Sequence, residues 1–111
     1  MGSACFVPRV SYKSPACDST IDLTGKQSFL FSWDMLPIPS GNRDSYRVVI
    51  IKEPNAGAVF NQVIDPRTFS VEVPASIFEN GCRYSWHVRQ RDGKTFYWSE
   101  YDIWYFNVVK K

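Results

Sequence analysis

The aromatic and basic residues near the C-terminal end of the sequence form the group best suited to chemistry. Arg89 and Arg91 alternate along one stretch, and Trp98-Ser99 follow shortly after the turn pair Asp92-Gly93. A guanidinium group that stacks on an indole ring gains about 0.5–2 kcal/mol. Two interpretations stay open for this set: a structural ladder of stacked side chains, which we favour, and a binding surface.

Three further aromatic residues lie in the same region, and they raise the question of sugar binding. Phe96, Tyr97 and Tyr101 fall in or near the last loop that the sequence predicts, where a sugar ring could stack on them. In the alternative interpretation they pack on the arginine ladder or against the strand ends. Glycan binding therefore stays open beside a structural role.

Signatures of catalysis and metal binding are missing from the sequence. It contains no Gly-x-Ser-x-Gly, no phosphate-binding Gly-Lys-Ser/Thr loop and no His-Glu-x-x-His. The single histidine, His87, follows Cys82 by five residues, so in a strand the two side chains would point to opposite faces. We expect no enzymatic activity, no metal site and no cofactor.

Length and charge restrict the remaining classes of protein. The 111 residues correspond to one domain, with about 6–109 structured, and 44% of them are hydrophobic, which is enough for a packed core. The net charge of +2 and the scattered positions of Arg67, Arg83, Arg89 and Arg91 argue against nucleic-acid binding. No apolar run approaches the ~20 residues of a membrane-spanning helix.

The elements that must position these residues are predicted to be β-strands. Prolines are spread from Pro8 to Pro74, and no sustained helical periodicity is present. Short alternating runs separated by turn residues indicate an antiparallel all-β domain. The seven predicted strands are Cys5–Tyr12, Gln27–Asp34, Ser45–Glu53, Ala58–Ile64, Thr68–Val73, Cys82–Arg91 and Ile103–Val109.

Alternation along these runs predicts which side chains face the core. The predicted inward set is Phe29, Phe31, Trp33, Tyr46, Val48, Ile50, Phe69, Val71, Val73, Tyr84, Trp86, Val88, Trp104, Phe106 and Val108. Trp33 and Trp86 are the largest of these residues, and we expect them to fill the space between two packed sheets.

The order of these motifs resembles that of a fibronectin type III domain, and the resemblance covers about Phe6 to Val109. Its motifs are Phe29-x-Phe31-x-Trp33, Tyr46-x-Val48-x-Ile50, Phe78-x-x-Gly81-x-x-Tyr84-x-Trp86-x-Val88, Trp98-Ser99-x-Tyr101 and Trp104-x-Phe106-x-Val108. Two stretches resemble bacterial surface-protein members of that family: Ser14-Pro15-Ala16 before Ile21-Asp22-Leu23-Thr24-Gly25, and the last two of the motifs above.

This resemblance implies a seven-stranded antiparallel immunoglobulin-like sandwich. It also implies a tyrosine corner, in which the Tyr84 hydroxyl bonds to the backbone of the preceding loop. Trp98-Ser99-x-Tyr101 resembles the Trp-Ser-x-Trp-Ser ladder of cytokine-receptor fibronectin modules, with Tyr101 in place of the second Trp; in that family the ladder is chiefly structural.

The outer face of the second sheet is a candidate docking surface. Val49 and Ile51 point outward where an ordinary solvent-facing strand would carry polar residues. The predicted face consists of Arg47, Val49, Ile51, His87, Arg89 and Tyr105. It would dock a neighbouring domain or partner chain; in the alternative, which we favour, the arginine and tyrosine stems simply cover Val49 and Ile51.

The topology implied by the resemblance bears on the cysteines. If one disulfide forms, we expect Cys17 to pair with Cys82, because both would lie at the same pole, and Cys5 to stay out of it. Reduced thiols are the alternative.

Three functions remain for such a domain. The leading one is a non-enzymatic interaction or spacer module of a larger secreted or cell-surface multidomain protein. The others are a carbohydrate-binding accessory module of a secreted hydrolase and a receptor-type module that binds a protein ligand. The family implies an extracellular, cell-surface or periplasmic location, and Gly2-Ser3-Ala4-Cys5 faintly resembles a lipoprotein processing site, which would anchor the parent protein by lipid.

Overall fold

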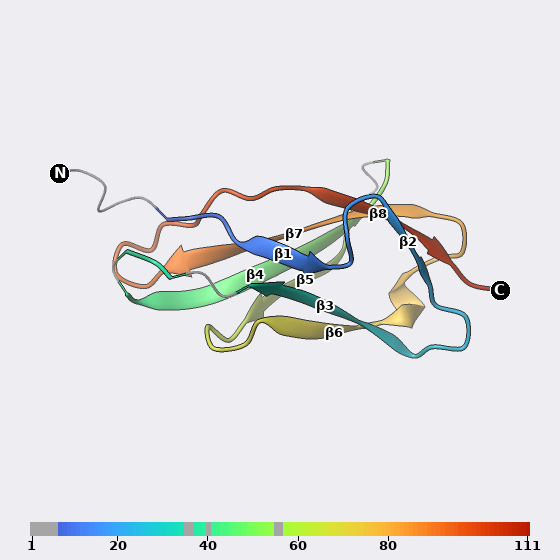
Figure 1. Ribbon diagram of the computed structural model, residues 1–111, viewed down its shortest axis with the longest axis horizontal. Helices are drawn as coiled ribbons and strands as arrows, with labels where there is room; N and C mark the ends of the chain where they lie inside the picture. The colour runs from blue at the N-terminus through green and yellow to red at the C-terminus, as the bar shows by residue number, and fades with distance from the viewer. Residues whose placement is uncertain (1–6, 35–36, 40, 55–56) are drawn as a thin grey trace.

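The computed structural model describes residues 7–34, 37–39, 41–54 and 57–111, and these form two β-sheets packed face to face (Figure 1). The predicted all-β sandwich is therefore confirmed. Cys5 and Phe6, where the first strand and the structured region were expected to begin, lie outside the described residues.

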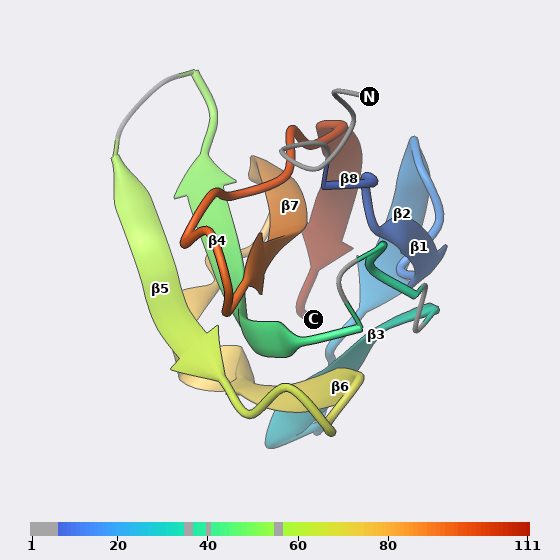
Figure 2. The ribbon, with the colours of Figure 1, turned by 90° about the vertical axis from the view of Figure 1, so that its left-hand side faces the viewer.

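The two sheets have three and five strands (Figure 2). The smaller sheet has the order β1-β3-β6, with β1 at Ser11–Ser14, β3 at Ser28–Asp34 and β6 at Ser70–Pro74. The larger sheet has the order β2-β8-β7-β4-β5, with β2 at Ser19–Asp22, β8 at Trp104–Val109, β7 at Arg83–Asp92, β4 at Arg43–Lys52 and β5 at Ala58–Ile64. A 3-10 turn, η2 (Ala75–Ile77), follows β6.

The N-terminal segment differs most from the prediction, because it contributes to both sheets. β1 pairs antiparallel with β3, and after the turn at residues 15–18 the chain crosses over, so that β2 pairs parallel with β8. The described part of the chain thus has eight strands, and one pair of them is parallel. Within the predicted strand Cys5–Tyr12, residues 7–10 form no β-ladder. Pro8 has no backbone N–H to donate to a neighbouring strand. The Pro8 carbonyl accepts a hydrogen bond from the side chain of Gln90, through Nε2 (2.7 Å).

The core between the sheets is built largely from aromatic rings. Phe31 and Trp33 from β3 and Trp86 from β7 all belong to this core, and each is at most 1% exposed. The ring of Phe31 packs edge-on against Trp86 with 5.1 Å between centroids, and also edge-on against Phe106 at 5.7 Å. Edge-to-face pairs of this kind contribute about 0.5–1.5 kcal/mol beyond their buried area. The expected central positions of Trp33 and Trp86 are confirmed.

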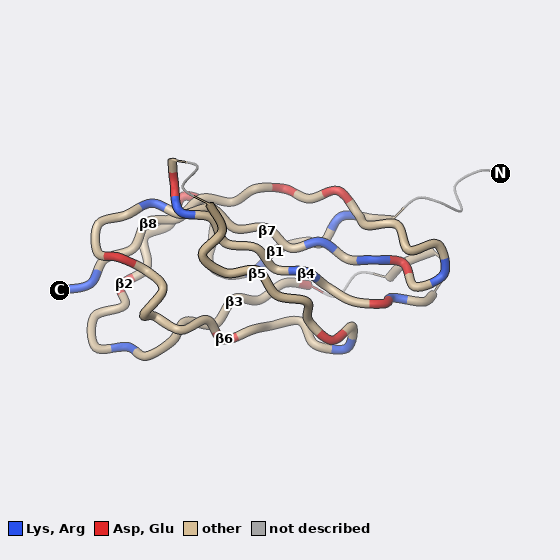
Figure 3. The backbone as a smooth tube through the Cα atoms, turned by 180° about the vertical axis from the view of Figure 1, so that it is seen from behind, with Lys and Arg blue, Asp and Glu red and all other residues tan. Residues whose placement is uncertain are grey.

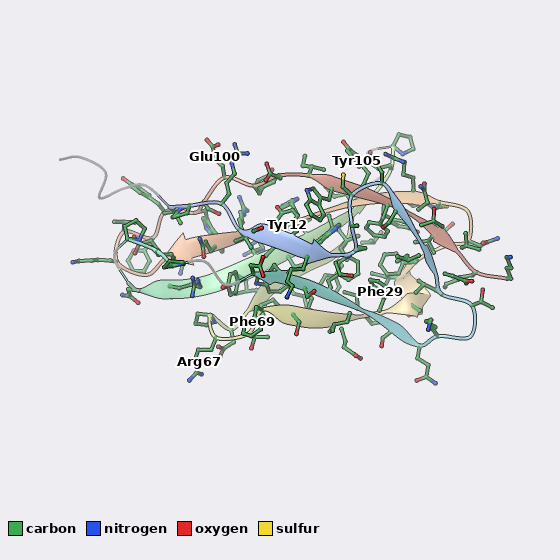
Figure 4. All side chains as sticks on the ribbon, in the orientation of Figure 1. Tyr12, Phe29, Arg67, Phe69, Glu100 and Tyr105 are labelled. Atoms are coloured by element: carbon green, nitrogen blue, oxygen red, sulfur yellow. The ribbon has the colours of Figure 1, made fainter. Side chains whose placement is uncertain are left out.

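Phe69 is a correction to the predicted core. Its side chain is 49% exposed, although alternation placed it inward with Val71 and Val73. The turn after β5 closes with a hydrogen bond from the Thr68 N–H to the Asp65 carbonyl, and β6 begins only at Ser70. Phe69 therefore lies at the end of the sheet, where half of its ring remains in solvent (Figure 4).

The connection from β6 to β7 contains the tyrosine corner that the resemblance implied. The fully buried Tyr84 extends its hydroxyl back to the loop, where it accepts a hydrogen bond from the backbone N–H of Glu79 (2.8 Å). Gly81 turns the chain with φ at +77°, a conformation that favours glycine. Tyr84 is thus a tyrosine corner, and it fixes the start of β7.

Candidate binding surface

The register between β4 and β7 brings the predicted docking residues onto one face of the larger sheet. Arg47 pairs with Arg89 directly across the two strands, and Val49 pairs with His87. Ile51 pairs with Ser85, which in turn pairs with Tyr105 on β8. All six predicted residues (Arg47, Val49, Ile51, His87, Arg89 and Tyr105) therefore share the outer face.

The segment that follows β7 folds back beside that strand and carries Trp98 onto this face. The turn is closed by a hydrogen bond from the Phe96 N–H to the Asp92 carbonyl (2.7 Å), and Phe96 has a positive φ of +64°. Trp98 then forms a β-bridge with Arg91. Ser99, which is buried, donates its N–H to the Gln90 carbonyl and accepts the Gln90 N–H at its hydroxyl. This short ladder positions Trp98 firmly beside the strand.

Cationic and aromatic side chains alternate along the face, and we name the set formed by Phe96, Arg91, Trp98, Arg89, Arg47, Tyr101 and His87 the cation–aromatic ladder. Arg91 lies over both Phe96 and Trp98, at 5.2 and 5.5 Å from the ring centroids. Arg89 lies over Trp98 at 5.0 Å and over Tyr101 at 5.7 Å. Arg47 approaches Trp98 at 5.6 Å from β4. Three guanidinium groups thus converge on one indole ring, which confirms a stacked ladder at Trp98.

The three arginines differ in how their charge is balanced. Arg91 forms an ion pair with Asp44, with 2.7 Å between its Nε and the carboxylate. Arg47 donates to the neutral amide oxygen of Asn61 (2.7 Å). Arg89 forms no ion pair within the described residues, and its buried Nε has no hydrogen-bond acceptor there. The ladder therefore carries more positive than negative charge.

His87 ends the ladder as a neutral ring. Its imidazole stacks on the phenol of Tyr101 with 3.9 Å between centroids, and the residue is only 8% exposed. Burial, assisted by the nearby charge of Arg89, lowers the pKa of His87 from 6.5 to about 4. At neutral pH the imidazole adds no charge to the three arginines.

The apolar stripe expected on this face is largely covered by the chain itself. Val49 is 8% exposed, and Ile51 is half-buried. The low exposure of Val49 agrees with the favoured alternative for the predicted docking face, in which neighbouring side chains cover the apolar residues. The accessible part of the surface is thus polar, cationic and aromatic.

The aromatic residues predicted for glycan stacking are exposed, but only two of them belong to the ladder. Phe96 is 62% exposed, Tyr97 52% and Tyr101 38%. Phe96 contacts Arg91 and Tyr101 contacts Arg89, whereas Tyr97 has no ring or cation contact within the described part of the chain.

Hydrogen bonds and ion pairs that the sequence did not indicate hold the segment next to Tyr101 in place. Arg9 donates to Glu100 (2.8 Å) and to Asp102 (2.6 Å), residues more than ninety positions away. Tyr12 donates its hydroxyl to the Asp102 carbonyl (2.6 Å), and burial raises the pKa of Tyr12 to about 12. These contacts fix residues 100–102 over the sandwich, at the upper edge in Figure 4. Partners this distant in sequence give no local signal.

Cys17 and Cys82 are both free thiols, so the expected pair is not a disulfide in this structure. Strand β8 lies between the segments that carry them. Ser19, just after Cys17, pairs with Phe106, whereas the Cys82 carbonyl accepts from the Val108 N–H on the other side of β8. The reduced alternative is the one that the structure contains.

Other kinds of site have little support in the structure. No group of three His, Cys, Asp or Glu side chains among the described residues could hold a metal ion. A shallow hollow of about 300 Å³ is lined by Pro37, Ile38, Gly41 and Arg43 and does not involve the ladder. Within residues 7–34, 37–39, 41–54 and 57–111, no helix is both long and apolar enough to cross a membrane.

Comparison with known proteins identifies the fold. No protein-family model and no curated protein matches the sequence. The third fibronectin III domain of the human KIAA0343 protein has a similar solution structure, with a TM-score of 0.63 and 15% identity over 99% of this chain and 88% of that domain. The chain has the fibronectin type III fold. The core tryptophans and the tyrosine corner of this fold are thus in the places that the sequence resemblance gave them.

A second similar structure places the same fold inside a much larger protein. The α-L-rhamnosidase from Dictyoglumus thermophilum matches with a TM-score of 0.66 and 19% identity over 94% of this chain. The chain spans only 13% of the length of that enzyme. A similar fold therefore also occurs as one part of that rhamnosidase.

Proposed function

We propose that this chain is a non-catalytic module with the fibronectin type III fold, which serves a larger secreted or cell-surface protein as an interaction or spacer unit. The observation that carries the proposal is the likeness to a segment that makes up 13% of a rhamnosidase. Neighbouring domains of the same polypeptide, or another protein, are the partners proposed.

The packing of the described residues supports a spacer role. The large side chains of the domain fill the space between the two sheets. Four of them are each at most 1% exposed: Trp33, Tyr46, Phe106 and Trp86. A core packed in this way leaves the surface, rather than an enclosed cavity, to provide specificity.

The experiment for this proposal is an immunoblot of the source organism with antibodies against this chain, after separation of cytosol, membrane and medium. We expect a polypeptide several times larger than 12.8 kDa in the surface or secreted fraction. A band of about 12.8 kDa in the cytosol would contradict the proposal. Hydrolysis of glycoside or ester substrates by the isolated chain, abolished by one substitution, would contradict the absence of catalysis.

Carbohydrate binding is the second candidate, and the exposed rings of Phe96, Tyr97 and Tyr101 favour it. A glycan array probed with the isolated chain tests it, with Tyr97→Ala and Tyr101→Ala as variants. Loss of a glycan signal in either variant would support the candidate. Leu30→Ala serves as a matched control, because Leu30 is similarly exposed (47%) on β3 of the other sheet.

A further inference from the structure

The charges on the cation–aromatic ladder are not balanced by other described residues. Arg9, Arg67, Arg83 and Arg91 each form an ion pair with a carboxylate. Among the described residues, Arg47 and Arg89 form none, although they lie directly opposite each other on β4 and β7. Figure 3 shows basic positions along these strands. Like charges opposite each other in a sheet destabilise it, so an anion placed between them would be bound favourably.

Although the guanidinium groups of Arg47 and Arg89 stack on Trp98, only some of their N–H groups donate hydrogen bonds to other described residues. The guanidinium carbons of Arg47 and Arg89 both lie over the Trp98 ring, at 5.6 and 5.0 Å from its centroid. The N–H donors of a guanidinium lie in its plane, in a fork that matches a carboxylate. Arg47 uses one of its terminal nitrogens on Asn61, and its other donors remain for a ligand.

Exposed rings flank this pair of cations. Tyr101, 38% exposed, lies against Arg89, and Phe96, 62% exposed, lies against Arg91 beyond Trp98. Aromatic faces beside a cationic pair suit a ligand that has both a flat apolar surface and a carboxylate. A pyranose ring that carries a carboxyl group has both, and two unpaired guanidinium groups suit one or two carboxylates rather than a long polyphosphate.

We infer that the ladder binds an acidic saccharide, with a sugar carboxylate held between Arg47 and Arg89 and a ring stacked on Tyr101 or Phe96. This inference rests on the carbohydrate-binding candidate above and deepens it by naming the charge of the ligand. Phe96 supports the assignment, because its positive φ places a bulky residue where glycine or asparagine would be less strained.

The test is isothermal titration calorimetry of the isolated chain, at low salt, with three ligands: tetragalacturonate, its tetramethyl ester and tetraglutamate. We expect tetragalacturonate to bind at least tenfold more tightly than the other two, and its affinity to fall as NaCl is added. Equal binding of the methyl ester would overturn the acidic-sugar inference and leave carbohydrate binding standing. Equal binding of tetraglutamate, or no binding of tetragalacturonate, would overturn the inference as well.

Substitutions of single arginines test whether Arg47 and Arg89 form the binding site. Arg89→Gln and Arg47→Gln should each weaken tetragalacturonate binding at least tenfold. Arg67→Gln is the matched control, because Arg67 lies in the turn after β5, far from Glu100 in Figure 4, and should leave the affinity within twofold. Near-ultraviolet circular dichroism checks the fold. Should Arg89→Gln disturb the stack, Arg47→Gln decides the outcome, and unchanged binding in that variant would overturn the site.

Discussion

His87 should make the stability of the domain depend on pH between about 6.5 and 4. The folded chain binds a proton at His87 with a pKa of about 4, against 6.5 for the ordinary imidazole, because the ring is buried against Tyr101. The unfolded chain therefore binds the proton more tightly, and protonation favours unfolding. The free energy of unfolding should be highest above pH 6.5 and should fall as the pH drops toward 4.

The magnitude follows from the interval between the two pKa values. One pKa unit corresponds to about 1.4 kcal/mol, so the drop from 6.5 to about 4 corresponds to an upper limit of about 3 kcal/mol. Urea denaturation at half-unit steps of pH measures it, followed by tryptophan fluorescence. Because His87 is the single histidine of the chain, its proton signals in an NMR titration give the folded pKa without ambiguity.

The control is His87→Phe, which keeps a flat ring against Tyr101 and removes the titratable group. Its free energy of unfolding should be nearly constant between pH 6.5 and 4.5, where the carboxylates of both proteins are still mostly ionised. A wild-type profile that is flat over this interval would refute the reasoning. An equal decrease in His87→Phe would refute it too, since the decrease would then come from other groups.

Three substitutions test the packing and the ladder by urea denaturation. Trp86→Ala should cost about 3–5 kcal/mol, because it leaves a large cavity between the sheets; a loss below about 1 kcal/mol would contradict its burial. Tyr84→Phe should cost about 1 kcal/mol, because the Glu79 N–H loses its acceptor, and unchanged stability would argue against the tyrosine corner. Trp98→Ala should cost about 1–2 kcal/mol, since three guanidinium groups lose their shared ring; no loss would show that these stacks are not held in solution.

Much of the fold could be predicted from the sequence, because alternation is strong where one face of a strand is buried. Phe31-x-Trp33, Tyr46-x-Val48-x-Ile50 and Tyr84-x-Trp86-x-Val88 all face the core as expected. Strand β2 could not be predicted in this way. It has four residues at a sheet edge and one buried side chain, Ile21, so its pattern is too short to distinguish from a turn.

The site could be predicted only in part, for a different reason. Alternation placed Arg47, Val49, His87 and Arg89 on one face, and that placement depends only on local geometry. The partners that balance or cover these residues come from distant segments. Asp44 and Asn61 reach the ladder through the pairing of β4 with β7 and β5, and Arg9 fastens the loop behind Tyr101 across more than ninety residues. Sequence spacing alone does not encode such contacts.

The central claim, that the ladder around Trp98 is a ligand site and more than a structural device, is tested most directly by NMR. The chain labelled with ¹⁵N is titrated with tetragalacturonate, and the side-chain N–H signals are followed. We predict that the Trp98 indole and the Nε signals of Arg47 and Arg89 shift together with one dissociation constant, while the indole of Trp33, buried in the core, stays in place. Shifts confined to Arg67 or to the C-terminal lysines, or no shifts at all, would contradict the claim.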